Sequence, residues 1–170
     1  METAAEQGDA EINYLYKNKS MKPLILLVIV FIGSLAATRI FGGAFDYMLS
    51  GNIAMAAMLL LTSLGHFRFT KGMVMMLPGF IPVKTAMVYF TGLVEIAAAI
   101  GLLLPRFRHL TGCWLIVFFV LMLPVNINAA IKKIDYEKGD YTGSGLSYLW
   151  FRVTLQVLFI GWVWFFSVKT

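Results

Sequence analysis

The sequence predicts an all-α protein, a polytopic membrane helical bundle. Three observations predict this class. Of the 170 residues, 59% are apolar and 14% are charged, whereas a soluble domain is about 45–50% apolar and about a quarter charged. The apolar residues are gathered in long uninterrupted stretches, and the basic residues flank those stretches, as they do in membrane proteins. This composition excludes a disordered chain and argues against an ordinary soluble enzyme.

Five stretches are long and apolar enough to cross a bilayer. They are residues 23–41, 52–67, 85–104, 110–131 and 148–168, and the second is the shortest. The preceding segment, residues 1–22, is a polar tail that we expect at the membrane surface. The first stretch follows three lysines, as a signal peptide would, but the charged region before it is long, so we expect a retained transmembrane helix.

The segment between the second and third stretches, residues 68–84, is apolar but unsuited to crossing a membrane. Pro78 and Pro82 would interrupt a helix in the middle of any span. We therefore expect the segment to lie in the interface, with its Met and Phe side chains in the acyl boundary. A methionine-rich copper site is the alternative, and no cluster of His or Cys accompanies the methionines to support it.

The positive charges are distributed unequally between the two ends of the predicted bundle. Ten lie on the side of the N-terminus: Lys17, Lys19, Lys22, Arg68, Lys71, Lys84, Lys132, Lys133, Lys138 and Arg152. Four lie on the other side: Arg39, Arg106, Arg108 and Lys169. Cytoplasmic loops carry the excess of Lys and Arg, so we expect the N-terminus in the cytoplasm.

Several chemistries are excluded by what the chain lacks. The basic residues form loop flanks instead of one basic face, which excludes nucleic acid as a partner. The single cysteine, Cys113, leaves no disulfide, CxxC pair or iron–sulfur ligand set. The two histidines, His66 and His109, lie on opposite sides of the predicted bundle. This chain alone therefore holds neither a bis-histidine haem nor a histidine-rich zinc site, and we predict no metal site.

Glu95 is the acid that the composition leaves unexplained, because it lies near the middle of the third stretch. A charged acid at the centre of a transmembrane helix costs about 2.5–3.5 kcal/mol on insertion scales. We therefore expect it to face the bundle interior and to have a polar partner. It is either a residue that joins neighbouring helices by hydrogen bonds or a group that carries a proton or binds a ligand.

Four further polar residues converge on the same half of the bundle if the five stretches cross in turn. They are His66, Asn126, Arg152 and Gln156. We expect the Glu95 carboxyl to reach at least one of them, directly or through one water. Each also has a structural alternative: an interfacial histidine, an arginine that reaches lipid phosphates, or an amide that satisfies backbone groups freed by Pro124. Asn128 lies about 200° from Asn126 around the helix and should point elsewhere.

Several short segments follow one another in a fixed order from residue 52 to the C-terminus. They are residues 65–67, 76–78, 80–82, 88–96, 101–108, 123–126, 149–152 and 155–156. Together they resemble the DoxX-like family of small membrane proteins. The resemblance implies a four-helix membrane domain over residues 52–170, with residues 23–41 as an added N-terminal transmembrane helix. It also picks out the same five residues: His66, Glu95, Asn126, Arg152 and Gln156.

The resemblance implies two functions. The family includes small subunits linked to thiosulfate and quinone oxidoreduction, and subunits associated with redox-defence proteins. It also resembles a chaperone that assists receptor assembly. We favour a non-catalytic subunit or assembly factor of a larger membrane complex, so that the isolated chain is not expected to be an enzyme. The alternative is a membrane subunit of a quinone-linked oxidoreductase of the thiosulfate:quinone type, with Glu95 and His66 handling protons and quinone as the candidate cofactor.

The expected surroundings follow from these functions. The lipid bilayer is one partner, and other membrane subunits or further copies of this chain are the others. The expected location is the bacterial cytoplasmic (inner) membrane. A carrier of protons or small solutes is a third hypothesis, which the lack of a visible repeat pair weakens.

Overall fold

The computed structural model describes residues 21–143 and 145–169, and this part of the chain is all-helical, as predicted. The polar tail lies outside the described residues, apart from Met21 and Lys22. The helices are α2 (Lys22–Gly42), α3 (Tyr47–Arg68), α4 (Thr70–Met76), α5 (Lys84–Leu103), α6 (Pro105–Ile131) and α7 (Leu146–Val163), and α7 continues into a π-helical turn, η1 (Trp164–Val168).

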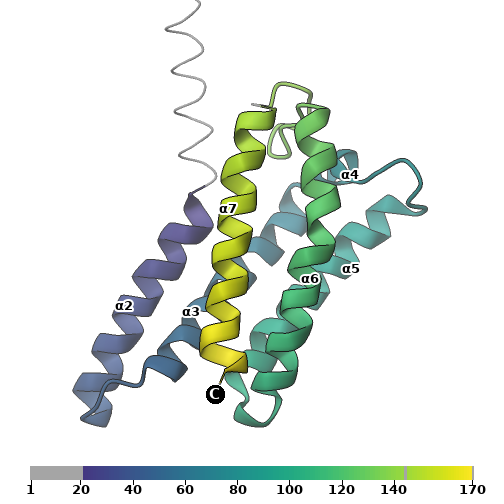
Figure 1. The fold of residues 1–170 in the computed structure, drawn as a ribbon. Helices are drawn as coiled ribbons and strands as arrows, with labels where there is room; N and C mark the ends of the chain where they lie inside the picture. The colour runs from purple at the N-terminus through teal and green to yellow at the C-terminus, as the bar shows by residue number, and fades with distance from the viewer. Residues whose placement is uncertain (1–20, 144, 170) are drawn as a thin grey trace, which may run out of the picture.

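Five helices are long and apolar enough to span a membrane, which confirms the predicted number. They are α2, α3, α5, α6 and the continuous helix that α7 forms with η1. Successive long helices run in opposite directions (Figure 1), so that α4 and the α6–α7 connection lie at one end of the bundle. The α2–α3 and α5–α6 connections lie at the other end. This arrangement fits a multi-pass membrane protein.

Two predicted boundaries were wrong, and the helix N-termini explain both. Helix α3 begins at Tyr47 because the Asp46 carboxylate accepts a hydrogen bond from the Leu49 amide at 2.8 Å, which caps the helix. At 22 residues, α3 is longer than α5, so the second span is not the shortest. Residues 105–109, which separate the third and fourth predicted stretches, are helical, because Pro105 occupies the first position of α6, where its fixed φ favours a helix.

Helix α3 lies at the centre of the packing, and α2 lies at its edge. In the most apolar stretch of each helix, half of the α3 residues are buried, against 6% in α2. The only buried residue of α2 is Leu27, which packs in a core with Met55 and Met58 of α3 and Leu115 of α6. The other large apolar side chains of α2 are partly or largely exposed. In a bilayer, acyl chains would cover the exposed ones.

The segment after α3 folds back on the protein and does not cross the bundle, as its two prolines predict. Helix α4 packs against the end of α6, where Met76 is buried with Ala129 and Ile134. Asn128 holds it there by donating a hydrogen bond to the Met76 carbonyl at 2.6 Å. The expectation that the Met side chains lie in lipid is therefore wrong for Met76, whereas Phe80 is 84% exposed.

A polar cluster, which we call the α3–η1 clasp, joins α3 to the far end of α7. The Asn52 side chain is fully buried and donates to the Phe166 carbonyl at 2.8 Å, and it accepts from the Ser167 hydroxyl at 2.7 Å. The Trp162 indole donates to the Gly51 carbonyl at 3.0 Å. A π-helical turn displaces carbonyls from their usual α-helical partners, and here Asn52 pairs with one of them. The sequence analysis did not single out Asn52.

Candidate functional site

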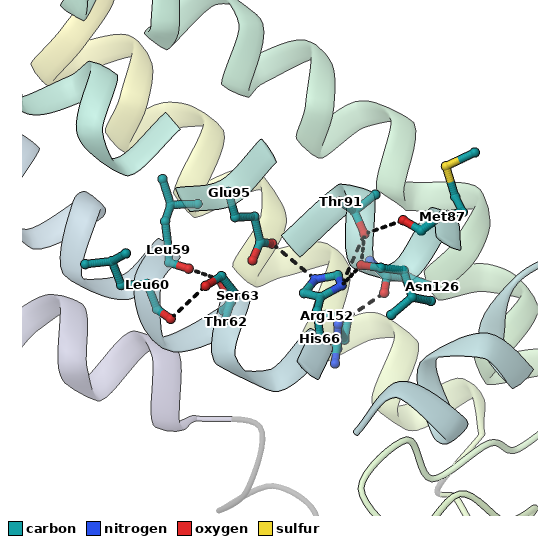
Figure 2. Close-up of polar contacts among 11 residues, drawn as sticks. Leu59, Leu60, Thr62, Ser63, His66, Met87, Thr91, Glu95, Asn126 and Arg152 are labelled. Carbon is teal, nitrogen blue, oxygen red and sulfur yellow. Dashed lines mark hydrogen bonds and ion pairs between the residues drawn. The ribbon is translucent and has the colours of Figure 1, made fainter. Parts of the chain in front are cut away.

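The buried acid predicted from the sequence lies inside the bundle and faces a histidine. Glu95 is 7% exposed, on the side of α5 that packs against α3. Its Oε1 lies 3.5 Å from Nε2 of His66, two residues before the end of α3 (Figure 2). This contact agrees with the expectation that Glu95 has a polar partner, and the partner is His66. We call the two residues the His66–Glu95 pair.

The close contact between α3 and α5 at the pair depends on a glycine. A Cβ placed on Gly92 would lie 3.0 Å from the Cβ of His66, tighter than most real contacts of this kind. Any larger residue at this position would push the histidine away from α5. Gly92 therefore determines how near His66 comes to the Glu95 side chain, which begins three residues later in the same helix.

The other ring nitrogen of His66 is also engaged, by the turn of α5 that precedes Glu95. Its Nδ1 lies 3.0 Å from the Val88 carbonyl oxygen and 3.1 Å from the Thr91 hydroxyl. The Thr91 hydroxyl lies 2.9 Å from the same carbonyl and 3.1 Å from that of Met87 (Figure 2). The imidazole is therefore contacted at both nitrogens by groups of one helix, α5.

The second carboxylate oxygen of Glu95 has no hydrogen-bond partner. In the part of the chain that the structure describes, two buried side-chain atoms lack one, and these are Glu95 Oε2 and Ser50 Oγ. Leaving a buried polar atom unsatisfied costs about 1–3 kcal/mol, and more when it is charged. A proton, a water or a ligand that donates a hydrogen bond would remove this cost at Oε2.

The remaining three predicted residues, on α6 and α7, form a second hydrogen-bonded group. Arg152 donates to the Asn126 side-chain oxygen at 3.1 Å, and the Asn126 amide donates to Gln156 at 3.4 Å. Gln156 in turn donates to the Phe119 carbonyl. The structure thus divides the five predicted residues into the His66–Glu95 pair and this chain, which we call the Arg152–Asn126–Gln156 chain.

Pro124 lies in α6 close to the point where Gln156 bonds this helix. Proline has no N–H, so the carbonyl four residues earlier, that of Val120, loses its usual partner. Gln156 donates to the neighbouring carbonyl, that of Phe119. The guanidinium of Arg152 also lies over the Tyr136 ring, 5.2 Å from its centroid. Each member of the Arg152–Asn126–Gln156 chain therefore has a hydrogen-bond partner inside the protein, whereas Glu95 Oε2 of the His66–Glu95 pair has none.

The sequence analysis missed Thr91 and Gly92. Thr91 lies four residues before Glu95, the spacing that places two side chains on one face of a helix, and this was the signal that could have found it. The prediction that Asn128 points away from Asn126 is confirmed, because Asn128 bonds the Met76 carbonyl on α4. Among the described residues, no group of three or more His, Cys, Asp or Glu could hold a metal ion.

In the connection before α7, residues 132–143 lie outside the membrane-spanning helices and are held by hydrogen bonds. Asp135 accepts hydrogen bonds from the backbone of Glu137 and Lys138. The Thr142 hydroxyl and backbone amide both donate to Asp140, and these bonds hold the pKa of Asp140 below its usual value of 3.8. Asp140 is therefore ionised at neutral pH, and its contribution to the loop is lost only when the pH falls through that lowered pKa.

The five apolar helices and the buried pair define the class of protein: a small helical protein of the multi-pass membrane type with an ionisable pair inside its bundle. A family model described as a domain of unknown function, DUF8561, matches residues 55–167, and the chain belongs to this family. The matched region begins within α3, so α2 lies outside it. Searches of curated proteins and of solved structures gave no match.

Proposed function

We propose that this chain is a small membrane subunit or assembly factor of a larger membrane complex, and that its His66–Glu95 pair handles a proton inside the bundle. The observation that carries the proposal is the buried Glu95 Oε2, which has no hydrogen-bond partner. In a carboxyl that only joins helices, both oxygens are expected to have hydrogen-bond partners, since an oxygen without one is costly in a bilayer. An oxygen that must accept and lose a proton, in contrast, needs a lone pair that no other donor occupies.

The likeness to the DoxX-like family remains part of this proposal. Its support is the division of the chain into a peripheral helix, α2, and four long helices. The match to the domain of unknown function, which is a different family model, covers residues 55–167, and these include most of α3 and all of α5, α6 and α7. We propose that these four form the DoxX-like core and that α2 is the added helix.

We further propose that the protein lies in the bacterial cytoplasmic membrane with its N-terminus in the cytoplasm. The support is the ten-to-four excess of Lys and Arg on one side. Because successive helices run in opposite directions, the described Lys and Arg residues lie at the two ends of the bundle between which they were divided.

Cysteine labelling tests this orientation. In a Cys113→Ser background, an impermeant thiol reagent is expected to label an Ala44→Cys variant, in the α2–α3 connection, in intact spheroplasts. A Lys132→Cys variant, at the other end of the bundle, should be labelled only after lysis. Both positions are exposed. The reverse pattern would overturn the proposed orientation.

The proton-handling role is tested by a Glu95→Gln substitution. The amide retains the shape of the side chain and can still hydrogen-bond, but it cannot titrate. We expect the variant to assemble into the larger complex as the wild type does, measured by co-purification, and to lose the proton-linked activity of that complex. The matched control is Glu137→Gln, which makes the same change at a carboxylate outside the membrane-spanning helices and should keep the activity. Full activity of the Glu95→Gln variant would end the proton-handling proposal.

A quinone-linked oxidoreductase subunit is the second candidate, and one observation favours it. A carboxylate oxygen that lacks a donor, next to an imidazole, suits the hydroxyl of a quinol headgroup, which needs groups that accept its protons. Extraction of the purified chain should then yield bound quinone, and the Glu95→Gln variant should yield less. A purified and folded wild-type chain without quinone would favour the assembly-factor function.

A further inference from the structure

We infer that α5 holds His66 with a proton fixed on Nδ1, so that His66 Nε2 and Glu95 Oε1 share a single further proton, and that Thr91 is the positioning residue for this arrangement. The inference rests on the proposed proton-handling function and names how the pair is set for it. It follows from the contacts of the two ring nitrogens.

The Val88 carbonyl identifies the proton on Nδ1. A carbonyl oxygen can only accept a hydrogen bond, and Val88 O lies 3.0 Å from His66 Nδ1. A bare nitrogen at that distance would put two lone pairs against each other. Nδ1 therefore carries the proton that makes this contact favourable.

The Thr91 hydroxyl reinforces the same assignment. Its single proton points to an α5 carbonyl, because the oxygens of Val88 and Met87 lie 2.9 and 3.1 Å away and neither can donate. Its lone pair is then left to accept from Nδ1 at 3.1 Å. All of these contacts are satisfied together only when Nδ1 is the donor.

With Nδ1 protonated, the contact between Nε2 and Glu95 Oε1 contains one proton. In one arrangement a neutral imidazole accepts from the carboxylic acid, and in the other an imidazolium donates to the carboxylate. Moving the proton from Oε1 to Nε2 breaks one O–H bond, forms one N–H bond and leaves the pair neutral overall. A neutral pair avoids the penalty that a single charge would carry in a bilayer.

This arrangement gives the two residues different tasks. A proton cannot pass through the imidazole ring, because both routes from Nδ1 end at carbonyls that cannot pass it on: one leads directly to Val88, and the other leads through the Thr91 hydroxyl to Val88 or Met87. Protons therefore enter and leave the pair through Glu95, whose Oε2 has no partner. His66 holds the shared proton in the meantime, and Thr91 acts only through His66.

The chain contains two histidines, which makes a direct test feasible. In a His109→Gln background, the ¹⁵N spectrum of labelled histidine in lipid nanodiscs reports His66 alone. Both arrangements of the pair carry a proton on Nδ1, so its shift is expected in the protonated range at pH 7. A bare Nδ1 with a protonated Nε2 would overturn the inference.

The role of Thr91 is read in a Glu95→Gln, His109→Gln background, with the pH raised until the ¹⁵N shifts show a neutral ring and both tautomers can be compared. We expect Thr91→Val to lower the ratio of the Nδ1–H to the Nε2–H tautomer roughly 3- to 10-fold, the effect of one lost hydrogen bond. Thr91→Ser should preserve the ratio. An unchanged ratio in Thr91→Val would remove Thr91 from the inference.

These results are separable from the proposed function. Full activity of the Glu95→Gln variant would end proton handling even if the Nδ1–H tautomer is found. A bare Nδ1 would overturn the tautomer even if Glu95→Gln abolishes activity. If Thr91→Val fails to fold, the Nδ1 shift of the otherwise wild-type His66 still decides the inference.

Discussion

Replacing His66 by leucine is expected to lower the free energy of unfolding by about 2 kcal/mol, because Glu95 then lacks its ion-pair partner inside the bundle. An acid at this depth costs about 2.5–3.5 kcal/mol when charged. Protonation of the lone carboxyl would recover part of this cost, so the expected loss is somewhat smaller. Reversible unfolding of the protein in bicelles or mixed micelles measures it.

The control for this prediction is the double variant His66→Leu with Glu95→Leu. Replacing both members of a buried pair by apolar residues is often neutral or stabilising, whereas removing one member is costly. The double variant should therefore recover most of the lost stability. A His66→Leu protein as stable as the wild type would show that the free energy of unfolding does not depend on the contact between His66 and Glu95.

Replacing Asn52 by leucine is also expected to destabilise the protein, by about 2 kcal/mol. The substitution removes the donor to the Phe166 carbonyl and the acceptor of the Ser167 hydroxyl, and both groups are left inside the protein without those bonds. Single interhelical hydrogen bonds in membranes contribute about 0.6 kcal/mol on average and up to about 1.7. When several such hydrogen bonds are lost at one buried site, the loss of stability should approach the sum of their contributions.

Thr154→Val is the matched control for Asn52→Leu. The Thr154 hydroxyl donates only to the Trp150 carbonyl of its own helix, at an exposed position. We expect its effect to stay within about 0.5 kcal/mol, as for most surface substitutions. Thermal unfolding of the three proteins in one detergent compares them. Equal midpoints would contradict a stabilising role for the α3–η1 clasp.

The number and order of the long helices could be predicted because each depends on a local run of apolar residues. The starts of α3 and α6 could not be predicted from apolarity alone. Helix α3 begins at Tyr47 because of the Asp46 cap, and α6 begins at Pro105 because proline suits the first turn. Turn and cap chemistry decides such boundaries more strongly than hydrophobicity does.

The burial of Glu95 could likewise be predicted, since an acid in a long apolar stretch cannot face lipid. The sequence could not predict which of the four residues would be its partner, because that depends on the rotation of each helix about its axis. Arg152 has its bond with Asn126 on the neighbouring helix, and His66 reaches Glu95 because Gly92 lets α3 approach α5. The sequence shows both glycine and histidine, but not that they touch.

The α3–η1 clasp has a consequence for biogenesis. Asn52 lies early in the first helix of the four-helix core, and the groups that pair with it, at residues 166 and 167, are made more than a hundred residues later. During synthesis, α3 therefore enters the bilayer with a polar side chain whose later partners do not yet exist. Until the last helix is inserted, Asn52 has only the Met48 carbonyl of its own helix as a partner, so the rest of its amide stays unsatisfied wherever it faces lipid.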